Sequence, residues 1–227
     1  NIRKTNADGS IGMSGSLTAN ATIDAYTPYA IMAPLTVKSG VKLTIESGAR
    51  VKFYEWSSIT VERGGEVAVK GTIDSPISLV PSGDGVEWNG FTVNWGGRLQ
   101  LEYVNIEGAG SQAKGAVKSD GYASLWGCCI SGSDGIALDG GSVYATNTVI
   151  KSMGTAVANS AKLFNGVIED CDVVNASGNI YNTIIKDCRA VTSGNFSYCL
   201  FDNTDYANFN HYGNTSIAGD AKFIDGT

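Results

Sequence analysis

The sequence predicts an all-β, single-domain right-handed parallel β-helix, a β-solenoid in which each coil pairs with the next. The main observation is a phrase that occurs three times, at steps of 18 and 17 residues, as Asn147-Thr-Val-Ile-Lys-Ser, Asn165-Gly-Val-Ile-Glu-Asp and Asn182-Thr-Ile-Ile-Lys-Asp. This period is too short for helical-pair repeats and fits one solenoid coil. The second observation is composition, because 29 glycines, only 4 prolines and 43% hydrophobic residues are typical of an ordered, turn-rich β chain.

The N-terminal residues 1–35 lack the regular rhythm of the rest of the chain. Open-ended solenoids need their terminal coil covered against edge-to-edge association, so we expect these residues to form an N-terminal cap and a lead-in strand. Residues 36–207 are expected to form the coils of the β-helix. Residues 208–227 are expected to be a C-terminal segment of the same domain, in which no capping helix is evident.

In the first half of the predicted coils, short apolar triplets alternate with turns. Each triplet points its first and third residues inward and its second residue outward, which is the period of a β-strand. Turns such as Ser47-Gly48 and Gly96-Gly97 supply the backbone freedom for corners. The triplets are Leu43–Ile45, Val51–Phe53, Ile59–Val61, Val67–Val69, Ile77–Leu79, Phe91–Val93 and Leu99–Leu101.

In the second half, one apolar pair occupies an equivalent place in six coils. The steps between the pairs shrink from 24 to 16 residues, which indicates that loops are shortened around a constant cross-section. The longer loops, and any binding groove, are therefore expected on the N-terminal side. The pairs are Asn105-Ile106, Cys129-Ile130, Val149-Ile150, Val167-Ile168, Ile184-Ile185 and Leu200-Phe201.

Equal positions in neighbouring coils lie directly over one another, so the repeated residues predict ladders. Asn147, Asn165 and Asn182 are expected to form a structural asparagine stack at an inward-turning corner, each amide bonding to the next. The column after the apolar pair alternates in sign and predicts a solvated outer face with favourable opposite charges. Its members are Lys151, Glu169, Lys186 and Asp202.

A family resemblance is carried by the segments Leu35–Phe53, Gly71–Ile77, Trp88–Gly90 and Gly219–Asp225. They resemble secreted bacterial and archaeal right-handed parallel β-helix proteins of the pectate-lyase-like superfamily, in particular its non-catalytic surface members. The resemblance implies the fold and a secreted or cell-surface location, but it does not supply an activity. The Asn-Thr-Asp, Asp-Asp, Gly-His-Gly and Arg-Ile-Lys set of polygalacturonase-like members is absent, and no calcium-binding carboxylate cluster with a nearby base matches the pectate-lyase-like members.

Aromatic side chains at turns are candidates for carbohydrate binding, because sugar rings stack on exposed aromatic faces. Tyr54, Trp56 and Trp95 follow core strands where the chain enters a turn, so each ring is expected to be partly exposed. Packing of these rings between loop and body is the alternative. Trp88, which lies in one of the resembling segments, and Trp126, which lies beside a core pair, are expected to be structural.

Asp170 and Asp187 occupy the same position in successive coils, about one strand spacing, roughly 4.8 Å, apart. Together with Ser152 and Asn203 of the same column they could hold a calcium ion. They could also act as a glycosidase pair, or form a solvated turn neutralised by lysine. Calcium is the one cofactor that the sequence leaves open.

Five cysteines, a single histidine and no C-x-x-C pair argue against a zinc or haem site. Cys171 and Cys188 follow the repeated phrase at equal offsets, and their spacing permits a disulfide, but we expect a stack of buried free thiols. The formal net charge of −6 and the scattered Lys and Arg residues argue against a nucleic-acid partner. No run of about 18 apolar residues is present, so no membrane span is expected.

Three functions remain open at this stage. The first is a non-catalytic extracellular protein for surface adhesion or polysaccharide binding, which predicts an aromatic or acidic groove along one face. The second is a structural subunit that self-associates through its coil ends, as in a filament, surface layer or phage fibre. The third is a polysaccharide lyase or glycoside hydrolase, which predicts a cleft where carboxylates and a lysine or arginine converge. The absence of a recognisable lyase or hydrolase motif favours a protein that is not an enzyme.

Overall fold

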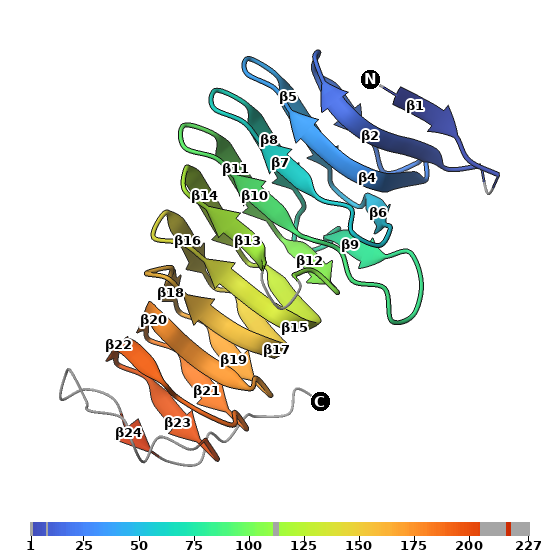
Figure 1. Cartoon of the computed structure of the whole chain (residues 1–227). Helices are drawn as coiled ribbons and strands as arrows, with labels where there is room; N and C mark the ends of the chain where they lie inside the picture. The colour runs from blue at the N-terminus through green and yellow to red at the C-terminus, as the bar shows by residue number, and fades with distance from the viewer. Residues whose placement is uncertain (1, 8, 111–113, 205–216, 219–227) are drawn as a thin grey trace.

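The computed structural model describes residues 2–7, 9–110, 114–204 and 217–218. These residues form 24 β-strands and no helix, and the strands stack coil upon coil along one axis (Figure 1). The first strand pair is antiparallel, and the coil-to-coil pairings that follow are parallel. The predicted all-β, parallel β-helix is therefore confirmed.

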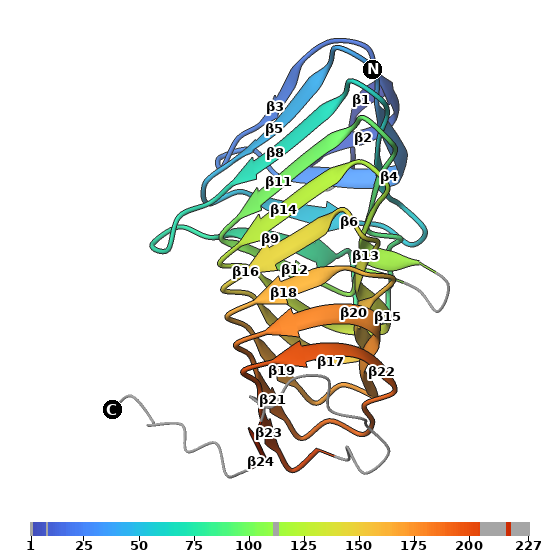
Figure 2. The ribbon, with the colours of Figure 1, turned by 90° about the vertical axis from the view of Figure 1, so that its left-hand side faces the viewer.

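Three sheets run along the axis, and the one that faces the viewer in Figure 2 is called sheet I here. Its strands pair in parallel with one-coil offsets, and each presents alternate residues to solvent. Sheet I consists of β3 (Ala21–Ile23), β5 (Lys42–Glu46), β8 (Glu66–Lys70), β11 (Arg98–Glu102), β14 (Tyr122–Trp126), β16 (Val143–Thr146), β18 (Lys162–Phe164), the C-terminal half of β20 (Val173–Tyr181) and β22 (Ser193–Ser197).

Sheet II contains the apolar pairs, and sheet III closes the cross-section. Sheet II consists of the first halves of β2 (Ile11–Leu17) and β4 (Tyr29–Val37), then β6 (Arg50–Phe53), β9 (Ile77–Pro81), β12 (Val104–Glu107), the first halves of β15 (Cys129–Asp139) and β17 (Val149–Ala158), then β19 (Val167–Glu169), β21 (Ile184–Lys186), β23 (Leu200–Asp202) and β24 (Ile217–Ala218). Sheet III consists of the second halves of β2, β4, β15 and β17, the first half of β20, and β7 (Ile59–Val61), β10 (Phe91–Val93) and β13 (Gly115–Ser119).

Coil pairing begins inside the segment 1–35, where the sequence analysis placed a cap. Strands β2, β3 and the start of β4 already pair in parallel with the next coil. Only β1 (Ile2–Thr5) has a different geometry, because it lies antiparallel to β2. Most of the segment 208–227 lies outside the described residues, except β24, which extends sheet II.

The core is a set of stacked columns of branched and aromatic side chains. The apolar pairs of sheet II are in register from coil to coil, as predicted, and the second member of each pair points inward. Burial of one such side chain stabilises the fold by about 1.5–3 kcal/mol. The column consists of Ile106, Ile130, Ile150, Ile168, Ile185 and Phe201, all at most 4% exposed.

In the coils that carry the repeated phrase, the corner between sheets I and II is made by one residue in the left-handed conformation. Asn147, Asn165 and Asn182 have φ values of 51°, 52° and 47°, a region that asparagine tolerates better than most residues. The Nδ2 of Asn182 donates to the Oδ1 of Asn165 at 2.8 Å, as a ladder requires. All three asparagines are exposed at this corner, and the residue after each is buried.

Candidate functional site

An aromatic cluster occupies the outer side of sheet I at strands β14 and β16. Strand β14 buries Ala123 and Leu125 and turns Tyr122, Ser124 and Trp126 outward, following the two-residue period of a strand. The pairing register sets Ser124 directly opposite the ring-bearing residue of β16, Tyr144. A small hydroxyl side chain is therefore surrounded by three aromatic rings.

The three rings around Ser124 are substantially exposed, at 43% for Tyr122, 47% for Trp126 and 39% for Tyr144. They line a pocket of about 400 Å³, called the Ser124 pocket here. Its residues are Leu101, Glu102, Tyr103, Tyr122, Ser124, Leu125, Trp126, Tyr144 and Thr146.

Tyr103 adds a fourth ring to the Ser124 pocket from a left-handed corner, with φ 50°. A Cβ atom at Gly127 would lie 2.9 Å from ring atoms of Tyr103, so this ring packs where only glycine leaves room. Glu102 supplies the carboxylate of the pocket.

Two cations hold the tyrosine rings in place. The guanidinium carbon of Arg98 lies 5.2 Å from the ring centroid of Tyr122, and the Nζ of Lys162 lies 4.6 Å from that of Tyr144. The two rings themselves are 5.9 Å apart and tilted by 30°. Lys162 also donates to the carbonyl oxygen of Gly141 at 2.8 Å. The two tyrosine rings therefore lie side by side with a cation over each, and these contacts orient the rings before a ligand binds.

A second pocket, of about 500 Å³, adjoins the first and shares Tyr122 with it. We call it the Trp95 pocket, and it is lined by Trp95, Gly96, Gly97, Arg98, Asp120, Gly121, Tyr122 and Ser142. Trp95 is 66% exposed, and the guanidinium carbon of Arg63 lies 4.7 Å from its ring centroid. The predicted exposure of Trp95 is confirmed.

The other two predicted aromatic residues lie elsewhere. Trp56 is 61% exposed but lies in the connection between β6 and β7. It therefore lies at the N-terminal ends of the sheet III strands, whereas Trp95 lies at their C-terminal ends. Its backbone carbonyl accepts a hydrogen bond from the Nδ2 of Asn89 at 3.0 Å. Tyr54 is half-buried in the same connection. The structure therefore does not combine Tyr54, Trp56 and Trp95 into one site.

Two tryptophans, Trp88 and Trp126, are predicted from the sequence to be structural, and only Trp88 is. Trp88 is fully buried and stacks on Phe53 with ring centroids 3.8 Å apart. Trp126 is instead half exposed at the end of β14, because it is an outward residue of sheet I and not part of the neighbouring core pair. The alternation of Tyr122, Ala123, Ser124, Leu125 and Trp126 was the signal that could have shown Trp126 to face outward.

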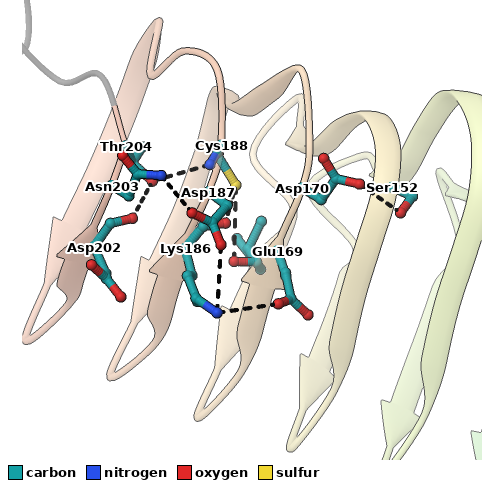
Figure 3. Close-up of polar contacts among 10 residues, drawn as sticks. Ser152, Glu169, Asp170, Lys186, Asp187, Cys188, Asp202, Asn203 and Thr204 are labelled. Carbon is teal, nitrogen blue, oxygen red and sulfur yellow. Dashed lines mark hydrogen bonds and ion pairs between the residues drawn. The ribbon is translucent and has the colours of Figure 1, made fainter. Parts of the chain in front are cut away.

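The aspartate column lies at the corner between sheets II and III (Figure 3). The Oγ of Ser152 donates to Asp170 at 3.1 Å, and the Nδ2 of Asn203 donates to Asp187 at 2.6 Å. The hydrogen bond from Asn203 and the nearby Lys186 ammonium hold the pKa of Asp187 below its ordinary value.

Lys186 joins this column to the outer charges of sheet II. Its Nζ lies 3.4 Å from Asp187 and 3.7 Å from Glu169, so the predicted alternation of charge is confirmed at this step (Figure 3). In the described part of the chain, no group of three or more His, Cys, Asp or Glu side chains could hold a metal ion. Calcium binding by Asp170 and Asp187 stays a prediction.

A cleft of about 590 Å³ lies under the long connection 82–90 between β9 and β10, on the N-terminal side where longer loops were predicted. Within it the Oε1 of Glu87 accepts a hydrogen bond from the Oγ of Ser133 at 3.2 Å, which ties the connection to β15. Its charged lining residues are Arg50, Asp84, Glu87, Glu107 and Asp134.

Residues 15–122 match the model of a family described as the pectate-lyase-like β-helix domain, which confirms the resemblance inferred from the sequence. No curated protein matches the chain. Among solved structures, the TibC-catalyzed hyper-glycosylated fragment 55–350 of TibA aligns over 92% of this chain and 94% of its own, at 14% identity. The TM-score of this alignment is 0.26. None of the described residues forms a helix able to span a membrane.

Proposed function

We propose that this chain, whose residues 15–122 match the pectate-lyase-like β-helix domain, is a non-catalytic extracellular protein that binds polysaccharide through sheet I. The observation that carries the proposal is the ring of Tyr122, Trp126 and Tyr144 around the small side chain of Ser124. Exposed aromatic patches of this kind are uncommon on surfaces without a binding role.

The chemistry of the Ser124 pocket suits a sugar. The faces of Trp126 and the tyrosines offer apolar area to the C–H side of a pyranose ring. The carboxylate of Glu102 accepts hydrogen bonds from sugar hydroxyls, and the hydroxyl of Ser124 both donates and accepts. Because Arg98 and Lys162 already orient the tyrosine rings, little side-chain entropy is lost on binding.

Binding is favoured over cleavage at this pocket because Glu102 is the only carboxylate among the described residues that line it. Glycoside hydrolysis in most families needs two carboxyl groups that flank the scissile bond. The family resemblance supports the proposed extracellular location, and an exposed sugar-binding face suits a protein that meets polysaccharide outside the cell. Self-association through the coil ends stays a prediction of the sequence.

A second candidate function is polysaccharide cleavage at the cleft under the connection 82–90. It is favoured by one observation, the convergence of Arg50 with Glu87, Glu107 and Asp134 on a single cleft. Release of reducing or unsaturated ends from a polysaccharide panel, measured with and without calcium, tests it. Activity abolished by Glu107→Gln would support cleavage, and no release from any substrate would count against it.

The binding proposal is tested by affinity electrophoresis and calorimetry on a panel of soluble polysaccharides. We expect at least one polysaccharide to retard the protein, and Trp126→Ala to weaken the binding tenfold or more. Trp56→Ala is the matched control, because Trp56 is an exposed tryptophan on a different part of the coil. Equal loss in both variants would contradict the proposal, as would a panel without any ligand.

A further inference from the structure

The Trp95 pocket and the Ser124 pocket form one trough across sheet I. They meet at Tyr122, the first residue of β14, and the trough continues past Ser124 to Trp126 at the end of the same strand. A strand advances about 3.3 Å per residue, so the segment from Tyr122 to Trp126 alone is roughly 13 Å long. That length exceeds one sugar ring and fits a short stretch of an extended chain.

The trough begins at the corner where Trp95 stands, beside Gly121. A Cβ atom at Gly121 would lie 2.4 Å from the carbonyl oxygen of Asn94, so the backbones approach too closely for a side chain. Gly96, Gly97 and Gly121 line the Trp95 end of the trough and carry no side chains, and Trp95 itself is 66% exposed there. At the other end Trp126 is 47% exposed, so a chain can leave past its ring.

Along the helix axis, by contrast, the aromatic surface is interrupted. On the N-terminal side of Ser124 the register places Gln100 and then Ala68. On the C-terminal side Tyr144 is followed by Lys162. In the row of paired residues that runs through Ser124 from coil to coil, Tyr144 is therefore the one aromatic residue among those named here.

The row of Trp126 offers the alternative axial path. It continues through Thr146 to Phe164 and Tyr181, whose rings stack on each other 5.0 Å apart at 8°. Both are only partly exposed, and on the other side of Trp126 the row continues with Glu102. The rings of Phe164 and Tyr181 therefore stack on each other and leave little free ring surface for a ligand.

Charges of both signs line the trough. Arg98 and Asp120 belong to the Trp95 pocket, and Glu102 belongs to the Ser124 pocket. Arg63 flanks Trp95, and Lys162 flanks Tyr144. A polyanion would meet the two carboxylates, and a polycation would meet the three cations, each without full compensation. A neutral chain of hydroxyl groups can bond to either kind of side chain.

We infer that the ligand is an internal stretch of a neutral, linear, extended polysaccharide that lies across sheet I, parallel to β14, from Trp95 to Trp126. The inference rests on the proposed function and adds the class and direction of the ligand. Trp126 and Ser124 hold one sugar unit, and Trp95 stacks on a unit further along the chain. A chain that lay along the helix axis would instead extend from Trp126 toward Tyr181.

The test uses neutral β-linked glucan, mannan, xylan and chitin oligosaccharides of increasing length, with uronic-acid oligosaccharides as the acidic arm. We expect affinity to rise with length and then level off. Trp126→Ala should weaken every ligand tenfold or more, whereas Trp95→Ala should weaken only the longer ones. Tyr181→Ala and Trp56→Ala should change affinity less than twofold.

The outcomes separate the inference from the proposed function. Loss of long-chain affinity in Tyr181→Ala but not in Trp95→Ala would overturn the transverse direction and leave glycan binding intact. Binding of uronic-acid chains alone would overturn the neutral class. No glycan binding at all would overturn both. Hydroxyl-radical footprinting of the unmodified protein gives the same answer without variants, because bound oligosaccharide should protect Trp95 and Trp126 but not Tyr181.

Discussion

Ser119 takes the inward position directly opposite Val93 on the neighbouring coil, in a column of sheet III where the two preceding coils have Val61 and Val37. Its side chain is 2% exposed, and its hydroxyl has no hydrogen-bond partner in the described part of the chain. A hydroxyl group is therefore buried in a column where the three preceding coils each place a valine.

Replacement of Ser119 by alanine should stabilise the protein. A buried hydroxyl without a partner costs about 1–3 kcal/mol of desolvation, so Ser119→Ala should raise the free energy of unfolding by about 1 kcal/mol. Urea unfolding measures the change. Ser57→Ala is the control with the opposite sign, because the buried Ser57 hydroxyl donates to the carbonyl oxygen of Tyr54 at 2.6 Å. A loss of stability in Ser119→Ala would show that its hydroxyl has a bonding partner after all.

Asp187 should titrate below an ordinary aspartate, chiefly because Asn203 donates to it and secondarily because Lys186 lies close. A carboxyl group with a depressed pKa in the folded state stabilises the fold at neutral pH and loses that contribution as the pH falls through the folded pKa. NMR titration should show a pKa below the ordinary 3.8, rising in Asn203→Ala. Lys186→Gln should raise it less. A larger rise of the Asp187 pKa in Lys186→Gln than in Asn203→Ala would show that the lysine, and not the asparagine, is the main cause of the low pKa.

The register of sheet II could be predicted from sequence because the core enforces it. Ile150, Ile168 and Ile185 must stack to fill a constant cross-section, so their neighbours repeat with the coil. The direction of the corner asparagines could not be predicted, since a ladder pattern is the same for inward and outward side chains. In the structure Asn165 is exposed and the following Gly166 is buried.

The aromatic site could not be located from spacing. Tyr122 and Tyr144 occupy different columns of sheet I, and the strands of this sheet follow connections of unequal length. Outward residues are under no packing constraint to repeat, so no phrase connects them. Only the pairing of Ser124 with Tyr144 brings the rings together.

None of the five cysteines forms a disulfide within the described part of the chain, and their thiols should differ in reactivity. Burial raises the pKa of Cys128 to about 11, whereas Cys129 is only partly buried. A hydrogen bond with Cys188, together with burial, raises the pKa of Cys171 above the ordinary thiol range. Burial raises the pKa of Cys129 as well, and the hydrogen bond with Cys171 lowers that of Cys188. Because Cys129 is the one partly exposed thiol and the other four are buried, iodoacetamide at pH 8 should still label Cys129 first.

Mass spectrometry of the labelled protein measures these rates, and labelling in denaturant should give all five sites at similar rates. Equal labelling of Cys128 and Cys129 in the folded state would contradict the assigned burial. Recovery of a Cys171–Cys188 disulfide would instead overturn the prediction of free thiols in that column.

Gly90 should tolerate no side chain. Its φ of 67° lies in the left-handed region, and a Cβ atom there would stand 2.4 Å from the carbonyl oxygen of Ala116 and 2.6 Å from that of Gly115. Backbone strain of this kind costs about 1–3 kcal/mol, and the contact with two rigid carbonyls of the next coil adds to it. Gly90→Ala should therefore lower the melting temperature by several degrees, as measured by circular dichroism. Gly83→Ala is the matched control from the same connection, because a Cβ atom there meets nothing within 4 Å and should leave the melting temperature unchanged. Equal melting of the two variants would mean that β10 and β13 can separate at this point without loss of stability.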